Sequence, residues 1–239
     1  MTTVPRITAV RLSLEGIQGS TKTSTAYTAP IPSVGFAFDG GFERALYGLK
    51  AEYWKGLDIK VYDYDLSVTK PDKDLWRGHD ITIFKLPQPI QTDPNKLQGK
   101  RQLWNYFNER IGLVAYDSEY VRSCIVDTMT LAREVRADAK LQSLQERPLS
   151  PGQSYRTNLI EIEYGDVNTS IRDIYLNFES IGVNLIALHH LADERKDMPV
   201  TSNNGSVSIQ STKTGNLILK GLYNTYQFVD MGIRMEMLV

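Results

Sequence analysis

The pattern of apolar and polar residues along the chain predicts strands that alternate with helices. Short apolar runs bounded by Gly, Pro, Asn or Asp are typical of strands, while apolar residues three and four apart are typical of helices. The predicted strands cover residues 6–14, 34–38, 81–84, 123–126 and 183–188, with further candidates at 216–222 and 226–234. The predicted helices cover residues 42–50, 95–111, 129–145 and 167–180, and a very short one starts at residues 24–27.

This order predicts an α/β fold in a single domain, residues 1–239, with a mostly parallel central sheet flanked by helices. Ligands of such sheets bind at the carboxyl ends of the strands. The last two strand candidates predict a C-terminal antiparallel hairpin that turns near residues 223–224. Residues 51–80 are expected to form an insertion or irregular segment. Residues 192–215 are polar and rich in Ser, Thr, Asn and Gly, which predicts a long mobile loop.

The net charge, the cysteine count and the absence of long apolar runs limit the classes of protein to which this chain can belong. The 239 residues carry a net charge of -1 and one cysteine, Cys124, so no internal disulfide can form. No run approaches membrane-spanning length and no secretory signal pattern opens the chain, so we expect a cytoplasmic protein with no membrane partner. A chain this close to neutrality has no global basic field. Any contact with nucleic acid would therefore need a local patch.

Residues 16–23, Gly-Ile-Gln-Gly-Ser-Thr-Lys-Thr, follow the first predicted strand and resemble a phosphate-binding P-loop. That motif has Gly, four residues, Gly, Lys and then Ser or Thr, and its backbone N–H groups hold phosphate oxygens. Thr21 stands where the second glycine belongs, and its side chain is expected to narrow the loop or change its backbone angles. A polar turn that contains Lys-Thr by chance is the alternative. The predicted nucleotide-binding residues are Gly16, Gly19, Ser20, Thr21, Lys22, Thr23 and Ser24.

Two predicted strands end in aspartate, at Asp39 and Asp127. In P-loop proteins the loop hydroxyl binds Mg²⁺ and an aspartate at a strand end helps to hold the metal. Thr23 and Asp127 are therefore the predicted metal residues. Taken alone, Asp127 has an alternative role as the N-cap of the helix that follows it.

The order of these motifs resembles that of the phage-encoded RecA-like ATPases, including the group associated with single-strand annealing and recombination. The resemblance spans most of residues 7–235 and is carried by Val10–Thr23, Val34–Gly41, Cys124–Thr130 and Asn184–Asp193. It implies a RecA-like P-loop core that uses ATP and Mg²⁺ in phage DNA recombination or annealing, in the host cytoplasm. The implied partners are single-stranded DNA or a phage recombination protein, and a homo-oligomer.

The resemblance also implies roles for individual residues. Lys22 would contact the β- and γ-phosphates. A carboxylate would orient the attacking water, with Glu43 slightly preferred and Asp39 placed nearer the metal. His189 and its neighbour His190 end a strand where groups that sense the γ-phosphate lie, and His189 is the predicted catalytic one. Strand side chains alternate, so one histidine would face the site and the other would face away.

Two other functions stay open at this point. A nucleotide-binding module for assembly or regulation, with little turnover, is favoured by Thr21. A P-loop nucleotide kinase would need an arginine-rich lid, and residues 147–156 supply two arginines. In the resembled family, residues 192–215 correspond to DNA-facing loops. They contain Arg195, Lys196 and Lys213 but no aromatic residue on which a base could stack.

Overall fold

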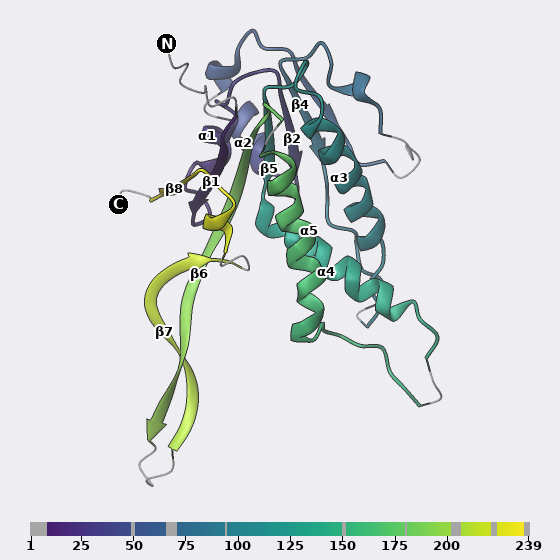
Figure 1. Ribbon diagram of the computed structural model, residues 1–239, viewed down its shortest axis with the longest axis vertical. Coiled ribbons are helices and arrows are strands. Elements are labelled where there is room, and N and C mark those ends of the chain that lie inside the picture. Colours follow the sequence, from purple (N-terminus) through teal and green to yellow (C-terminus); the bar gives the residue numbers. More distant parts are fainter. Residues whose placement is uncertain are drawn as a thin grey trace, which may run out of the picture.

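A single mixed sheet forms the centre of the computed structural model (Figure 1), which describes residues 9–48, 51–65, 71–93, 95–149, 152–179, 181–201, 207–220 and 224–236. The strands lie in the order β3-β4-β2-β5-β6-β1-β8, and β7 pairs with β6. The strands are β1 Arg11–Gly16, β2 Ser33–Ala37, β3 Ile59–Tyr62, β4 Ile81–Lys85, β5 Ser123–Asp127, β6 Asn184–Thr201, β7 Val207–Leu219 and β8 Met231–Met235.

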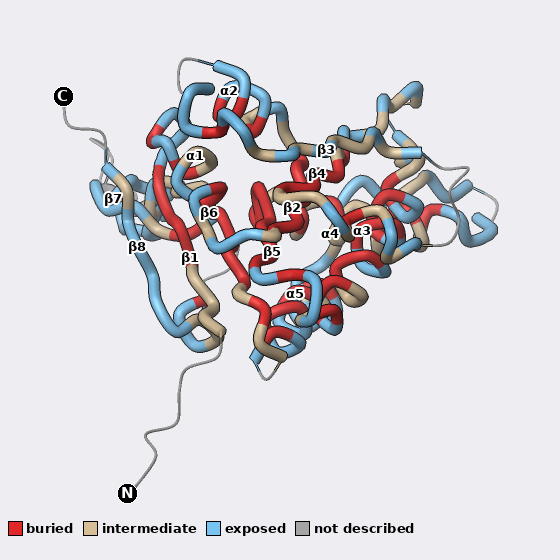
Figure 2. The backbone as a smooth tube through the Cα atoms, turned by 90° about the horizontal axis from the view of Figure 1, so that it is seen from above, coloured by how far each residue is buried: buried red, intermediate tan, exposed pale blue. Residues whose placement is uncertain are grey.

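Helices cover both faces of this sheet. They are α1 Lys22–Ala26, α2 Gly41–Tyr47, α3 Lys100–Ala115, α4 Met129–Gln145 and α5 Tyr164–Asn177. In Figure 2, α1 and α2 lie on one side of the strands and α3, α4 and α5 on the other. Among the described strands, all pairs are parallel except β6 with β7. The predicted α/β class with a mostly parallel sheet is therefore confirmed.

Burial on both faces explains why the central strands read as unbroken apolar runs. On the side of α3, α4 and α5, Phe36 stacks on Phe84 with ring centroids 5.5 Å apart and meets Phe107 edge-on at 5.2 Å. On the side of α1, the Tyr27 ring packs on Gly35, where a Cβ would lie 2.4 Å from the tyrosine oxygen. Gly35 thus lets the segment after α1 lie close against β2.

Residues 51–80, which were expected to be irregular, contribute the edge strand β3 and hydrogen bonds that reach the end of α3. β3 pairs with β4 and ends the sheet on that side. Further along, Trp76 Nε1 donates a hydrogen bond of 2.8 Å to the buried Asp117 carboxylate, which also accepts from Arg77. These bonds attach residues 71–77 to the end of α3.

The expected antiparallel extension of the C-terminal part is present, but its strand pairing and the segment expected as a loop differ from the sequence-based expectations. The antiparallel partner of β7 is β6 rather than the last strand, while β8 runs parallel to β1, with Leu12 opposite Met231. The turn expected near residues 223–224 lies partly outside the described residues. The described residues of the segment expected as a loop, 192–201 and 207–215, belong to β6 and β7. We call residues 192–201 and 207–218 the arm, because this ribbon leaves the core (Figure 1).

No described helix combines the length and the apolar character needed to cross a bilayer. The parallel strands β1, β2 and β5 end at one edge of the sheet, from which the arm also departs. The loops that carry the predicted site residues therefore meet there.

Candidate functional site

The loop between β1 and α1 is closed around the side chain of Lys22. This side chain is only 6% exposed. Its Nζ donates hydrogen bonds of 2.8 Å to the carbonyl oxygens of Gly16 and Ile17, and it lies 3.2 Å from Ser20 Oγ. Burial lowers the pKa of Lys22, while the charges of Asp127 and Asp39 oppose that change. The loop thus holds an ammonium group at its centre.

Thr21 occupies the backbone conformation that the missing glycine would take. Its φ is 62°, in the left-handed region, and Gly19 in the same loop has φ 87°. A β-branched residue rarely adopts a positive φ. The expectation that Thr21 would alter the loop's backbone angles is not met at this position, because the exposed threonine keeps the glycine-like angle.

Three oxygen atoms from three segments surround Gly41, the first residue of α2. A Cβ built there would lie 2.8 Å from Asp39 Oδ1, 3.2 Å from Thr23 Oγ1 and 3.6 Å from Asp127 Oδ2. Thr23 Oγ1 also donates a hydrogen bond of 2.9 Å to Asp127 Oδ2. Hydroxyl and carboxylate oxygens are the ligands that Mg²⁺ prefers. The donor set therefore fits this ion, and the glycine leaves the space between the donors open.

Asp127 is nearly completely buried, at 1% exposure. Burial raises the pKa of its carboxyl group to about 7, and the neighbouring charge of Asp39 adds to the rise. The Thr23 hydroxyl and the Lys22 ammonium act in the opposite direction. The N-cap role belongs to the next residue, Thr128, whose side chain accepts from the N–H of Leu131. Asp127 therefore does not cap α4, and its carboxylate points into the site.

The two candidates for the water-orienting carboxylate lie in different surroundings. Asp39 is beside Thr23 and Asp127, and its Oδ1 accepts from the Gly41 N–H at 2.7 Å. Glu43 lies in the first turn of α2 and forms an ion pair of 3.0 Å with Lys85 at the end of β4. The structure brings Asp39, rather than Glu43, into the group around the loop.

The two histidines face opposite sides of β6, and it is His190, rather than the predicted His189, that lies on the side of the loop. His189 is fully buried under α5, with Nε2 2.9 Å from the Tyr175 hydroxyl. His190 is half-buried on the loop side, where burial and then the charge of Lys22 lower its pKa while Asp39 raises it. Alternation along a strand predicts that the two side chains face opposite sides, but the sequence alone does not tell which of the two faces the loop.

Sequence reasoning also missed Glu15, the buried residue directly before the loop. Its carboxylate accepts a 2.7 Å hydrogen bond from the Tyr226 hydroxyl and lies 3.4 Å from the Arg234 guanidinium of β8. A glutamate inside an apolar strand was the available signal, since buried carboxylates require partners. This group joins the end of β1 to the C-terminal part of the chain.

Comparisons with known proteins add little to this description. No protein-family model matches the chain, and no curated protein is significantly similar to it. A crystal structure of a KaiC-like protein from the hyperthermophilic archaeon Pyrococcus horikoshii matches over 87% of this chain and 80% of that one, with 12% sequence identity and a TM-score of 0.29. A likeness at this level carries no conclusion about function.

The left-handed backbone conformation of Thr21 can be tested by measuring the free energy of unfolding of two variants. Both Thr21→Gly and Thr21→Ala remove the side chain beyond Cβ, but only glycine relieves the left-handed backbone, which costs other residues about 1–2 kcal/mol. We expect Thr21→Gly to be the more stable of the two by about 1 kcal/mol in urea unfolding, after allowance for the greater chain entropy of glycine. An alanine variant as stable as the glycine variant would show that φ is negative at this position.

The raised pKa of Asp127 predicts a specific pH dependence. Between its ordinary value near 3.8 and about 7, the folded chain keeps a proton that the unfolded chain releases, so stability falls as pH rises through this window. Asp127→Asn lacks that loss, and its stability relative to the parent should increase from pH 4 to 7 and then level off. Melting curves without Mg²⁺ or nucleotide measure this. Asp166→Asn is the control, because Lys140 lowers the pKa of Asp166 and the variant should show no such trend.

Proposed function

We propose that this chain is a RecA-like P-loop ATPase that binds Mg·ATP in the loop Gly16–Thr23. The observation that carries the proposal is the closed loop with the Lys22 ammonium at its centre and Thr23 bonded to Asp127 beside it. A buried cation next to a hydroxyl and a carboxylate is the set of groups that a polyphosphate and its metal require.

Each group has a defined task in this proposal. Lys22 exchanges its two carbonyl partners for β- and γ-phosphate oxygens, and the backbone N–H groups of the loop bind the remaining oxygens. Thr23 and Asp127 hold Mg²⁺, which neutralises phosphate charge when bound. The same positive charge favours the ionised form of Asp127, so metal binding and loss of its proton are linked.

Hydrolysis is assigned to Asp39 rather than Glu43. Asp39 lies beside the proposed metal residues and keeps its Oδ2 available to a water molecule, since Oδ1 accepts from Gly41. Glu43 would first have to leave Lys85. His190 replaces His189 as the group that contacts the γ-phosphate, because it faces Lys22 and Asp39.

A role in phage DNA recombination or annealing, in the host cytoplasm and with single-stranded DNA as a partner, belongs to the same proposal. It is supported by the order of the sequence motifs alone. Stimulation of phosphate release by single-stranded DNA would support that role.

A nucleotide-binding module with little turnover is the second candidate. It is favoured by the engagement of both carboxylates, Asp39 with Gly41 and Glu43 with Lys85. A nucleotide kinase is less well supported, because Arg156, one of the two arginines available for a lid, forms a double hydrogen bond of 2.8 and 2.7 Å with Glu163.

Removal of the Lys22 ammonium tests the binding site. We expect Lys22→Ala to weaken binding of Mg·ATP by roughly tenfold or more in calorimetry, since a buried charge-assisted contact contributes about 1.5–3 kcal/mol. The parent's melting temperature should rise with Mg·ATP concentration, and that of the variant should rise less at each concentration. Lys140→Ala, on the far side of the sheet, is the control. Equal affinity of parent and Lys22→Ala would exclude this loop as the site.

Phosphate release separates the two candidate functions and the two carboxylates. We expect Asp39→Asn to reduce steady release by about 100-fold, in the range of a lost acid–base group, with nucleotide affinity kept. Glu43→Gln should leave the rate within about threefold of the parent, because its partner is Lys85 rather than the site. The reverse order would return the role to Glu43. An absence of release from the parent, with and without single-stranded DNA, would establish the binding module.

A further inference from the structure

β8 lies at the edge of the sheet, beside the strand that leads into the phosphate loop (Figure 2). Four of its five residues are exposed and the fifth is half-buried. Apolar burial therefore contributes little to holding this strand in place. Besides its backbone hydrogen bonds to β1, two groups of polar side chains attach it to the core.

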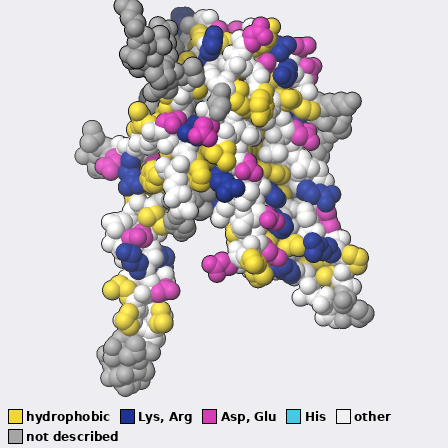
Figure 3. Space-filling model, in the orientation of Figure 1, with side chains coloured by type: hydrophobic (Ala, Val, Ile, Leu, Met, Phe, Trp, Pro, Cys, Tyr) yellow, Lys and Arg dark blue, Asp and Glu magenta, His cyan; other side chains and the backbone are white. Residues whose placement is uncertain are grey.

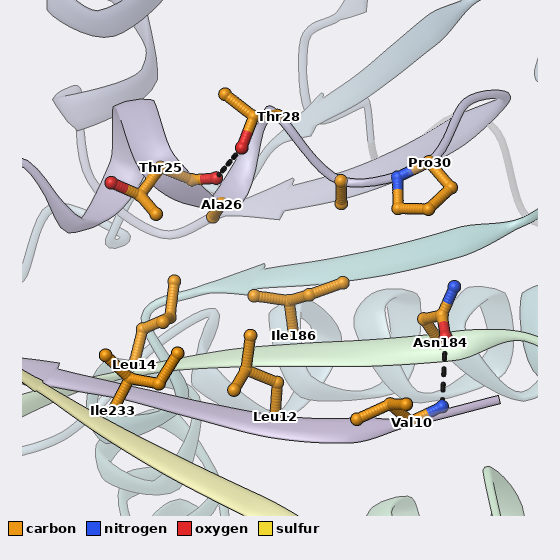
Figure 4. A pocket seen from close by; sticks show the side chains of 11 residues that line it. Val10, Leu12, Leu14, Thr25, Ala26, Thr28, Pro30, Asn184, Ile186 and Ile233 are labelled. Atoms are coloured by element: carbon orange, nitrogen blue, oxygen red, sulfur yellow. Dashed lines mark hydrogen bonds between the residues drawn. The ribbon is translucent and has the colours of Figure 1, made fainter. Parts of the chain in front are cut away.

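The side chains of β1 and β8 divide between the two faces of the sheet. Figure 4 shows Leu12, Leu14 and Ile233 pointing into an apolar groove between α1 and the sheet. Side chains alternate along a strand, so Glu15 and Arg234 face the other side. These two residues also stand opposite each other in the pairing of β1 with β8. They therefore lie together on the face of the sheet that is turned away from α1.

Glu15 is a carboxylate that the protein encloses. Acidic and basic side chains are mixed over the visible surface (Figure 3), and pairs exposed in this way contribute little to stability. The Glu15 side chain differs from them, because only 2% of it is exposed. Its Oε2 accepts a hydrogen bond of 2.7 Å from the Tyr226 hydroxyl and lies 3.4 Å from the Arg234 guanidinium. Its Oε1 accepts from Ser13 at 3.3 Å. We call Glu15, Tyr226 and Arg234 the clamp.

The Tyr226 ring reaches Glu15 across β8. Gly232 stands where the ring crosses the strand, and a Cβ there would lie 3.2 Å from the ring atom Cε1. The glycine thus leaves room for the ring. Burial raises the pKa of the Tyr226 hydroxyl, and its bond to Glu15 adds to the rise, so the hydroxyl keeps its proton and is the donor. The clamp therefore ties residues 224–236 to the last side chain before the loop.

A second group attaches the other end of β8. Asp230, directly before the strand, accepts hydrogen bonds of 2.8 Å from the Arg11 backbone N–H and of 3.0 Å from the Arg11 guanidinium. Arg11 begins β1, whereas Glu15 stands next to the loop. The two groups thus hold the same strand at opposite ends, and only the clamp is close to the phosphate site.

The end of β8 packs directly on the first residue of the loop. A Cβ built on Gly16 would lie 2.8 Å from the Met235 carbonyl oxygen and 2.4 Å from Ser20 Oγ, so this glycine is enclosed between β8 and the loop. The Gly16 carbonyl also accepts one of the hydrogen bonds of Lys22. The position of β8 therefore limits where the loop begins and where its ammonium group lies.

We propose that Glu15 is a positioning residue for nucleotide binding, a role that rests on the proposed function of the loop. Through Tyr226 and Arg234 it holds the end of β8 against Gly16, which keeps the loop in the form that receives phosphate. A loop already in its binding form loses less conformational freedom when the ligand binds. The clamp thus increases affinity without touching the nucleotide. By linkage, a nucleotide that binds the clamped form stabilises the clamp in turn.

Stability alone does not account for a carboxylate at this position. Removing an ionised group from water is costly, and well-packed apolar side chains of similar size often stabilise a protein as well or better. A buried carboxylate, however, requires hydrogen-bond donors in defined places. It therefore specifies one position of β8, where an apolar contact would permit several.

Calorimetry with Mg·ATP tests the clamp in Tyr226→Phe, which removes one hydroxyl and keeps the ring on Gly232. We expect the Kd to rise about tenfold, because a bond to a buried carboxylate is lost. Asp230→Ala is the matched control, since it loosens the same strand at the end remote from the loop. Its Kd should stay within about twofold of the parent's, as for a site without shared partners.

The results of this titration separate the clamp from the site. An unchanged Kd in Tyr226→Phe, or an equal loss of affinity in Asp230→Ala, would overturn the role of Glu15 while leaving the phosphate loop as the binding site. A parent that does not bind Mg·ATP would contradict the proposed function and this role with it.

Hydrogen exchange of the β8 amides tests the same contact without nucleotide. These amides should exchange about tenfold faster in Tyr226→Phe than in the parent, because the strand end opens more often. Glu15→Gln keeps an oxygen that accepts from the Tyr226 hydroxyl, so its exchange should lie closer to that of the parent. Mg·ATP should slow the exchange in the parent more than in Tyr226→Phe. Parent-like exchange in Tyr226→Phe would refute the clamp even where Mg·ATP binding is established.

Discussion

The bond between Thr23 and Asp127 joins parts of the chain on which the rest of the site depends. The hydroxyl belongs to α1 and the carboxylate to the end of β5, and in the sheet β6 separates β5 from β1. A hydrogen bond of 2.9 Å can span this separation only if the phosphate loop leans over the carboxyl edge of the sheet. The same inclination places Lys22 inside its loop and Gly41 against all three oxygens.

Hydrogen bonds and opposite charges offset the burial of these groups only in part. Lys22 and Asp127 are both almost completely removed from water, which would be costly for either charge alone. The lysine is satisfied by loop carbonyls and the carboxylate by one hydroxyl, which leaves Asp127 under-compensated and raises its pKa to about 7. The centre of the site therefore lacks positive charge. A metal cation is the ligand that removes such a deficit, so the electrostatics and the donor set favour the same occupant.

Local signals in the sequence predicted the loop, the flanking strands and Asp127, because spacing and apolar runs determine them over a few residues. The sequence alone did not reveal which face of the packed sheet a given side chain occupies. Asp39 precedes α2 and Glu43 lies in its first turn, while His189 and His190 are neighbours on one strand. Only the packed sheet distinguishes the members of each pair. The arm escaped detection because a ribbon exposed on both faces has no apolar face, and so lacks the alternation that identifies a strand. The parallel pairing of β8 with β1 joins residues more than two hundred positions apart, beyond any local pattern.

β6 shows how the two ends of the molecule are related. Up to His190 it is held by a neighbouring strand, since that residue pairs with Gly16 of the phosphate loop. Beyond this point its strand partner is β7, so the buried sheet changes into an exposed ribbon at the site itself. Lys220 stabilises the transition from the other strand, because its N–H donates to the His190 carbonyl and its ammonium pairs with Glu134 of α4. The direction of the arm is thus set by residues that border the phosphate loop.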